Sequence, residues 1–310
     1  MKRNIVIGPP GTGKTTFLKN KVDKLISGGH CKPDEIGYFS FTVKAAEEIR
    51  DRVTKEEWSE AELKKMFPYF CTLHSLAYKR LQLQQSHIMD QSDYDDLSRD
   101  TGRFFVNKMK KGNGMDISMP TAKSEYQDLI NLAYAKFPDD DDRLNQIFRT
   151  VKLGDYGARN TIEQMDVDLK NFKRDRDKLE YVDYFNHFLK KKNPPPLKYL
   201  FVDEAQDLSA HQWQVIDMIQ QVAKPIETYV AGDDDQAIFR WAGADIEHFI
   251  AMAKNDANTI IPLTQSYRIP KSVHTIATKL AQSISRRIDK SYKPRDEEGE
   301  RKVLNIRPLN

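Results

Sequence analysis

Short apolar runs alternate with longer amphipathic stretches near the start of the chain. Residues 4–7 and 36–41 have the β-branched and aromatic composition of strands, whereas residues 14–27 and 43–53 have the apolar spacing of helices. Such an alternation is typical of a parallel sheet whose strands are joined by crossover helices. The pattern therefore predicts an α/β fold with helices on both faces of a parallel sheet.

The pattern changes to amphipathic helical stretches with polar connectors between residues 82 and 192. This change predicts an inserted, all-helical subdomain. Three prolines at 194–196 follow, and the short apolar run at 199–202 is of the kind found in a buried strand. Residues 228–231 and 259–263 are further strand candidates. The sheet is therefore expected to resume after the insertion.

These boundaries divide the chain into three expected parts. Residues 1–81 and 193–285 form the sheet domain, and residues 82–192 form the helical insertion. Residues 286–310 are densely charged and end on a strand candidate at 303–306. Because that strand has no neighbours of its own, we expect a charged linker followed by the start of a truncated second core domain.

Composition narrows the class of protein. The chain has 310 residues, of which 39% are hydrophobic and 31% charged, which suits a soluble protein and excludes a disordered one. The net charge of +3 is nearly balanced, so any basic surface for a nucleic acid must be local. No apolar run reaches the length of about 18 residues that spans a bilayer. Cys31 and Cys71 lack metal-ligand spacing, which indicates a reduced, intracellular compartment.

A phosphate-binding loop is predicted between the first strand and the first helix. Residues 8–15 read GPPGTGKT, which fits the phosphate-loop pattern in its required context. Its glycines let backbone N–H groups face the phosphates, Lys14 would reach the β- and γ-phosphates, and the Thr15 hydroxyl would hold Mg²⁺. The alternative is a glycine-rich turn without a ligand. The expected nucleotide contacts in the loop are Gly8, Gly11, Thr12, Gly13, Lys14, Thr15 and Thr16.

Two adjacent carboxylates follow the apolar run at 199–202. Asp203 would hold Mg²⁺, directly or through water, and Glu204 would act as general base toward the attacking water. An Asp-Glu pair alone is usually a solvated surface feature. After a buried strand, in a chain with a phosphate loop, the pair instead predicts nucleotide hydrolysis.

Five further motifs resemble those of the UvrD/Rep/PcrA-type superfamily 1A DNA helicases. The motifs are FSFTVKAA at 39–46, TLHS at 72–75, DEAQD at 203–207, GDDDQAIFRW at 232–241 and QSYR at 265–268. Their order and rough spacing match the family from the first residues to about residue 307. The resemblance implies a RecA-like P-loop NTPase core.

The resemblance also assigns residues to single-stranded DNA. It implies base stacking by Phe41, Phe239 and Trp241, and backbone contacts by Thr42, Lys44, Thr72 and His74. Taken alone, Phe41 at the end of a strand would more often belong to the core, and Trp241 could equally pack under a loop. The basic residues between 170 and 178 could lie near duplex DNA or simply form a solvated helix face.

Gln236 and Arg268 complete the implied catalytic set. An amide at Gln236 could sense the γ-phosphate and relay its loss to Phe239 and Trp241, which follow closely in sequence. Arg268 resembles the arginine that neutralises charge in phosphoryl transfer, with a surface ion pair as the alternative. The family pattern usually has an arginine where Ala242 stands, and the motifs after the fourth are absent.

The implied function is an ATP-dependent 3′-to-5′ helicase or translocase that uses ATP and Mg²⁺. Its partners would be single-stranded DNA, junctions with duplex DNA, and a second core domain from downstream sequence or a partner chain. Its location would be cytoplasmic and nucleoid-associated, in repair or replication. The alternatives are the helicase part of a helicase-nuclease, and a non-catalytic ATP-regulated DNA-binding module. Because a motor cleft needs two walls, we expect this chain alone to bind nucleotide weakly and to hydrolyse it poorly.

Overall fold

The computed structural model describes most of the chain, namely residues 2–41, 46–47, 50, 58–107, 109–110, 114–115 and 124–300. The helix predicted at 43–53 lies largely outside these residues, and the strand predicted at 303–306 lies wholly outside them. Among the described residues, no helix is both long and apolar enough to cross a membrane.

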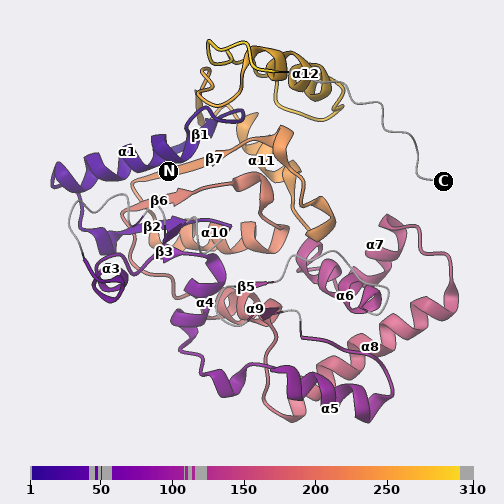
Figure 1. The fold of residues 1–310 in the computed structure, drawn as a ribbon. Helices are drawn as coiled ribbons and strands as arrows, with labels where there is room; N and C mark the ends of the chain where they lie inside the picture. The colour runs from indigo at the N-terminus through magenta and orange to yellow at the C-terminus, as the bar shows by residue number, and fades with distance from the viewer. Residues whose placement is uncertain are drawn as a thin grey trace.

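A six-stranded parallel sheet forms the centre of the fold, in the order β3-β2-β6-β7-β1-β8 (Figure 1). The α/β prediction is therefore confirmed. The strands are β1 (Lys2–Ile7), β2 (Ile36–Phe39), β3 (Phe70–Cys71), β6 (Tyr199–Val202), β7 (Glu227–Gly232) and β8 (Thr259–Pro262).

The strand predicted at residues 36–41 ends earlier, at Phe39. Phe39 lies opposite Val202, the last residue of β6, and the Asp203 N–H donates to the Phe39 carbonyl (2.9 Å). Beyond this point β2 has no ladder partner from β6. Phe41 therefore leaves the sheet and is only half-buried, which separates it from the core position that its sequence alone would favour.

Strand side chains alternate between two hydrophobic clusters on opposite faces of the sheet. Val6 and Phe201 pack on the face that α1 covers, whereas Ile5 and Val202 pack on the face that α4, α9, α10 and α11 cover. Both faces of the central strands are thus buried, as is usual in a parallel sheet, whereas the edge strand β8 is mostly exposed. The helices are α1 (Lys14–Ser27), α4 (Leu73–Leu81), α9 (Tyr181–Lys191), α10 (Ala210–Ala223) and α11 (Ile246–Ala253). Two further helices are α3 (Glu60–Met66) and α12 (Lys271–Gln282).

Four helices pack around a third hydrophobic cluster, away from the sheet (Figure 1). They are α5 (Gln91–Thr101), α6 (Glu125–Lys136), α7 (Arg143–Thr150) and α8 (Tyr156–Asp175). An antiparallel pair, β4 (Met109–Lys110) with β5 (Gly114–Met115), was not predicted for this segment. The last helix of the segment, α9, packs against α4 and contributes to the cluster beneath the sheet.

His211 on α10 is a buried histidine whose ring nitrogens have no hydrogen-bond partner among the described residues. Burial lowers the pKa of its ring to about 4. Because the folded state disfavours the proton, the stability from the neutral ring is fully present above pH 6.5 and is lost as the pH falls toward 4. Lowering the pH from 6.5 to 5 should reduce the unfolding free energy of the wild type. In His211→Leu we expect this reduction to be about 2 kcal/mol smaller.

Urea unfolding of both proteins at the two pH values measures this difference. His187→Leu, at an exposed position of α9, is the control and should follow the wild type. An equal pH dependence in all three proteins would contradict the expectation.

Candidate functional site

The phosphate loop joins β1 to α1 and is shaped by its own side chains. The buried Lys14 ammonium donates to the Gly8 carbonyl (3.0 Å), and the Thr12 hydroxyl donates to the Pro9 carbonyl (2.8 Å). Gly11 and Gly13 have φ values of 72° and 84°, a left-handed conformation that favours glycine. The loop thus presents an ammonium and a helix N-terminus at the end of a central strand, a combination suited to phosphate.

Asp203 follows β6 and is held by three donors. Its Oδ2 accepts from the Thr15 hydroxyl (2.9 Å) and from the buried Tyr38 hydroxyl (2.8 Å), and its Oδ1 accepts from the Glu204 N–H (3.0 Å). Burial, together with the neighbouring Glu204 carboxylate, raises the pKa of Asp203. A carboxylate and a hydroxyl that share one point at the phosphate loop form an oxygen donor set that fits Mg²⁺.

Glu204 has a strained backbone next to this carboxylate. Its φ of 52° is left-handed, which is uncommon for a residue with a side chain and is found at functional sites. The Gln206 amide donates to Glu204 (2.9 Å) and to Asp207 (3.3 Å). Burial, and then the Glu204 charge, raise the pKa of Asp207 to about 7. The buried amide thus links two carboxyl groups beside the phosphate loop.

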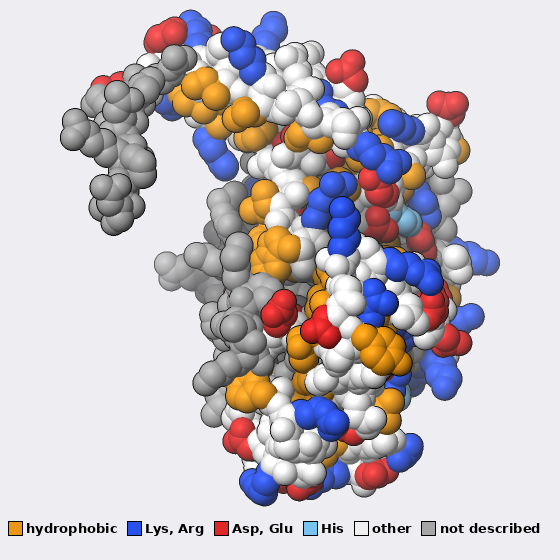
Figure 2. Space-filling view, turned by 90° about the vertical axis from the view of Figure 1, so that its right-hand side faces the viewer, with side chains coloured by type: hydrophobic (Ala, Val, Ile, Leu, Met, Phe, Trp, Pro, Cys, Tyr) orange, Lys and Arg blue, Asp and Glu red, His pale blue; other side chains and the backbone are white. Residues whose placement is uncertain are grey.

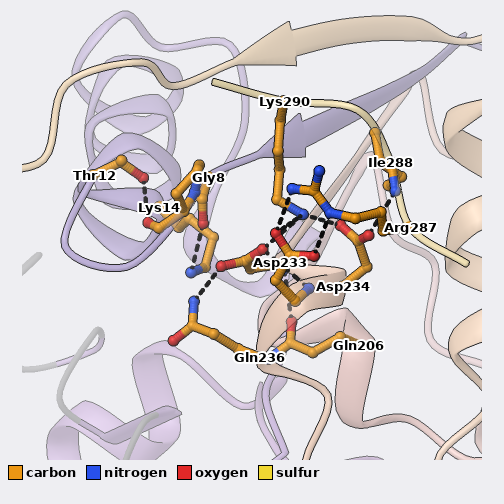
Figure 3. A network of polar contacts seen from close by, with 12 residues as sticks. Gly8, Thr12, Lys14, Gln206, Asp233, Asp234, Gln236, Arg287, Ile288 and Lys290 are labelled. Atoms are coloured by element: carbon orange, nitrogen blue, oxygen red, sulfur yellow. Dashed lines mark hydrogen bonds and ion pairs between the residues drawn. The ribbon is translucent and has the colours of Figure 1, made fainter. Parts of the chain in front are cut away.

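The loop after β7 continues the same network of polar contacts. The Gln206 carbonyl oxygen accepts from the Asp233 N–H (3.0 Å), and the Gln236 amide donates to Asp233 Oδ2 (2.5 Å). Gln236 ends the short 3₁₀ helix η4 (Asp234–Gln236). In Figure 3 the side chains of Lys14 and Gln236 point toward the same region beside Asp233. The structure therefore joins the acidic pair after β6 to the loop after β7.

Residues 265–268 lie directly on the phosphate loop. The Ser266 hydroxyl donates to the Pro10 carbonyl (2.7 Å), and the Tyr267 N–H donates to the Gly11 carbonyl (2.9 Å). A Cβ atom on Gly11 would come within 2.3 Å of the Arg268 Cβ. Arg268 is exposed beside the loop, which leaves its guanidinium accessible to a phosphate.

Three aromatic side chains gather at the far end of the loop after β7. The Phe41 and Phe239 rings stack with centroids 5.3 Å apart, and the Trp241 ring lies 6.3 Å from Phe239. Trp241 belongs to the 3₁₀ helix η5 (Arg240–Ala242) and is 38% exposed. The structure thus brings together the three residues assigned to base stacking and leaves part of their surface open.

The residues assigned to contacts with the DNA backbone do not form one cluster. The Thr72 hydroxyl caps α4 by accepting from the Ser75 N–H (3.2 Å). The His74 ring stacks on Tyr181 at a centroid distance of 3.4 Å, and burial lowers its pKa well below the ordinary value. Thr42 and Lys44 lie outside the described residues. The structure thus gives Thr72 and His74 structural contacts, and their contacts with DNA stay predictions.

The basic stretch near the end of α8 is neutralised by its neighbours. Each cation has a carboxylate partner: Lys173 with Glu180 and Asp183, Arg174 with Asp175, Arg176 with Asp96, and Lys178 with Asp93. On the face drawn in Figure 2, acidic and basic side chains are likewise interspersed. These pairs favour a structural role for the stretch over a contact with duplex DNA.

Comparison with known families decides the identity of this arrangement. Residues 1–257 match the family described as the UvrD/REP helicase N-terminal domain. The chain belongs to this family. The UvrD/REP resemblance drawn from the five motifs is therefore confirmed.

Relatives with curated names agree with the UvrD/REP assignment. The chain is 26% identical to the ATP-dependent DNA helicase PcrA of Staphylococcus aureus (strain Mu50 / ATCC 700699), over 96% of this chain and 40% of the relative. It is 28% identical to a probable DNA helicase of Mycoplasma pneumoniae, over 92% of this chain and 54% of the relative. The chain therefore spans about half or less of the length of these relatives.

Three residues of the UvrD/REP site were not predicted from the sequence. Tyr38 lies in a predicted strand and had no role assigned to it, and Gln206 lies inside a motif without a role of its own. Lys290, whose ammonium pairs with Asp233 (3.0 Å), lies in the charged segment. Gln206 could have been found, because an amide between two acidic residues of a hydrolysis motif needs partners for both its donor and its acceptor. No local signal marks the other two.

Removal of the Tyr38 hydroxyl is expected to weaken the metal site. Tyr38→Phe keeps the ring in the core but takes one of three donors from Asp203. Because a hydrogen bond to a charged group contributes about 1.5–3 kcal/mol, we expect the Mg²⁺ concentration needed for tight ATP binding to rise about tenfold. Titration of a fluorescent ATP analogue at a series of Mg²⁺ concentrations measures this requirement.

Tyr229→Phe is the matched control for Tyr38→Phe. The Tyr229 ring also packs on Phe201, but its hydroxyl donates to Glu227 and not to Asp203. It should leave the Mg²⁺ requirement unchanged. A shift of similar size in both variants would assign the effect to general packing.

Proposed function

We propose that this chain is the ATP-binding and single-stranded-DNA-binding first core domain of an ATP-dependent DNA helicase or translocase. The observation that carries the proposal is one loop, residues 233–241, that belongs to both sites. Its first residue contacts the Gln206 amide beside Glu204, and its last residues form the aromatic cluster with Phe41. A loop that contacts both sites can couple the presence of the γ-phosphate to the affinity for DNA.

At the nucleotide site the chain supplies positioning and charge. Lys14 and the helix N-terminus bind the phosphates, and Arg268 neutralises the charge that develops on the γ-phosphoryl group. Glu204 polarises the attacking water and accepts its proton. Thr15 and Asp203 would hold Mg²⁺, which would stabilise negative charge on the phosphate oxygens of ATP. The contact of the Gln236 amide with Asp233 supports a role for Gln236 in detecting the γ-phosphate.

At the DNA site the aromatic cluster offers faces for stacked bases. Phe41, Phe239 and Trp241 would stack on bases, and Thr42, Lys44, Thr72 and His74 would follow the backbone. Movement in the 3′-to-5′ direction and action at junctions with duplex DNA are part of the same proposal. A second core domain, supplied from further sequence or from a partner chain, is likewise part of the proposal.

The proposal also divides the chain into a core domain and an inserted subdomain, each with hydrophobic packing of its own. Residues 1–81 and 193–285 would form the RecA-like core, and residues 82–192 the inserted subdomain. The separate hydrophobic cluster of α5 to α8 supports this division. The packing of α9 beneath the sheet makes that helix the junction between the two parts. Residues 286–310 would lead toward the second core domain.

Binding of a fluorescein-labelled oligo-dT, followed by fluorescence anisotropy, tests the proposal. We expect binding by the wild-type chain, and a different affinity with a Mg²⁺-bound non-hydrolysable ATP analogue than with ADP. Because one stacked base contributes about 1–3 kcal/mol, Phe239→Ala should weaken binding about tenfold or more. Tyr156→Ala, at a highly exposed position of α8, is the control and should bind as the wild type does.

Two results would contradict the proposal. One is oligo-dT binding that Phe239→Ala leaves unchanged. The other is a chain that binds neither nucleotide. Equal DNA affinity with the analogue and with ADP would instead favour the reading as a module that binds both ligands without coupling them.

A further inference from the structure

A charged segment that follows α12 returns to the loop after β7 and clamps its three aspartates (Figure 3). The Lys290 ammonium pairs with Asp233 Oδ1 (3.0 Å), with Asp235 Oδ2 (3.0 Å) and with Asp234. The Ile288 N–H donates to Asp234 Oδ2 (2.6 Å). The Arg287 guanidinium makes two hydrogen bonds to the Asp235 carboxylate (2.9 and 2.7 Å). Residues 287–290 therefore contact every member of the acidic triplet.

This clamp is buried, so its charges depend on one another. The side chains of Asp233 and Asp234 are fully buried, and that of Lys290 is 7% exposed. Burial disfavours the ammonium, but the carboxylates outweigh that effect and raise the pKa of Lys290. A buried charge whose partner is removed is strongly destabilised. Loss of Lys290 must therefore be answered by a rearrangement of the carboxylates that it pairs with.

Asp233 connects the clamp to the nucleotide site. Its Oδ1 binds Lys290 and also accepts from the Asp235 N–H (3.3 Å), while its Oδ2 accepts from the Gln236 amide. Its N–H donates to Gln206, which in turn donates to Glu204. One carboxylate thus faces the clamp with one oxygen and the proposed γ-phosphate sensor with the other.

We propose that Lys290 is a positioning residue for ATP hydrolysis, which acts through Asp233 to set the orientation of the Gln236 amide. This inference rests on the proposed function, because it requires a γ-phosphate at the site. With Lys290 in place, Asp233 has one oxygen satisfied and holds the amide with the other. Without Lys290, Asp233 loses its charged partner and keeps only the two donors that the loop itself supplies, the Asp235 N–H and the Gln236 amide. The carboxylate then turns toward these donors, and Gln236 no longer adjusts to the γ-phosphate. Lys290 thereby connects the segment after α12 to the hydrolysis site.

The preference for an ATP analogue over ADP measures Gln236 directly, without turnover. We expect Lys290→Met to reduce the ratio of the two affinities about tenfold, to the level of Gln236→Ala. The double variant should show no further reduction, because both changes remove one coupled interaction. Lys290→Arg keeps the charge and should keep most of the preference. If Lys290→Met does not fold, Lys290→Gln replaces it, since it lacks the charge but retains a donor.

Arg287→Met is the matched control. Arg287 clamps the same loop through Asp235 and not through Asp233. Its loss should therefore lower the melting temperature and leave the nucleotide preference intact. An unchanged nucleotide preference in Lys290→Met would overturn the inference, and so would an additive loss of preference in the double variant. A loss of preference in Arg287→Met as large as that in Lys290→Met would also overturn it. A wild type that binds both nucleotides equally would overturn it too. A wild type that binds neither would instead refute the proposed function.

Discussion

Glu204→Gln should lower the rate of ATP hydrolysis about 1,000-fold while ATP still binds. The substitution removes the carboxylate that we propose accepts the proton of water, and a general base contributes typically about 10²–10⁴-fold to a rate. The Gln206 amide and the left-handed backbone hold the side chain at this position beside Asp203, and glutamine has nearly the same shape. Single-turnover hydrolysis with the protein in excess, with and without oligo-dT, measures the rate.

Glu227→Gln is the control for this substitution. Glu227 begins β7, at the end of the strand opposite the phosphate loop, so the rate should stay at the wild-type value. Comparable rates for Glu204→Gln and the wild type would remove Glu204 from the mechanism. A loss of ATP binding in Glu204→Gln would show instead that the residue holds the loop together.

Phe201→Ala should lower the free energy of unfolding by about 4 kcal/mol. The Phe201 ring is fully buried and lies between two tyrosine rings, with centroids 6.1 Å from Tyr38 and 5.1 Å from Tyr229. Its loss leaves a cavity in the centre of the sheet and frees the Tyr38 ring that carries the hydroxyl on Asp203. Urea unfolding measures the change in stability.

The same variant should also lose part of its Mg²⁺-dependent nucleotide binding. Ile226→Ala is the control, because that side chain is 61% exposed and its truncation should change stability by no more than about 0.5 kcal/mol. A loss near 1 kcal/mol in Phe201→Ala would mean that the tyrosine rings close over the cavity. The sheet would then be less rigid than its packing indicates.

The parts of the site that could be predicted are those whose sequence signal comes from residues close together in the chain. The phosphate loop needs a strand, a glycine-rich turn and a helix in succession, and the acidic pair needs a buried strand before it. Helix α1 was predicted with its observed bounds for the same reason, since its apolar spacing is local. Patterns within about 20 residues are therefore sufficient for the nucleotide-binding edge of the fold.

The parts that were missed depend on residues that folding brings together. Lys290 meets Asp233 across 57 positions, and Tyr38 meets Asp203 across 165. Neither contact has a periodic or motif signal, because a lysine in a charged segment and a tyrosine in a strand are each common. The left-handed φ of Glu204 also escapes prediction, since residues other than glycine seldom adopt it.

The strand order sets the spacing between the two proposed ligands. Lys14 follows β1, Asp203 follows β6, and Phe41 follows β2, so the sheet orders these residues along one edge as β1, β7, β6 and β2. Three strand spacings of about 4.8 Å give about 14 Å between the first and last strands. The strand order therefore fixes the distance between the two proposed ligands. The loop after β7 has to span most of that distance. Because this loop carries Gln236 near one end and Trp241 at the other, a change in its length would shift the two proposed sites relative to each other.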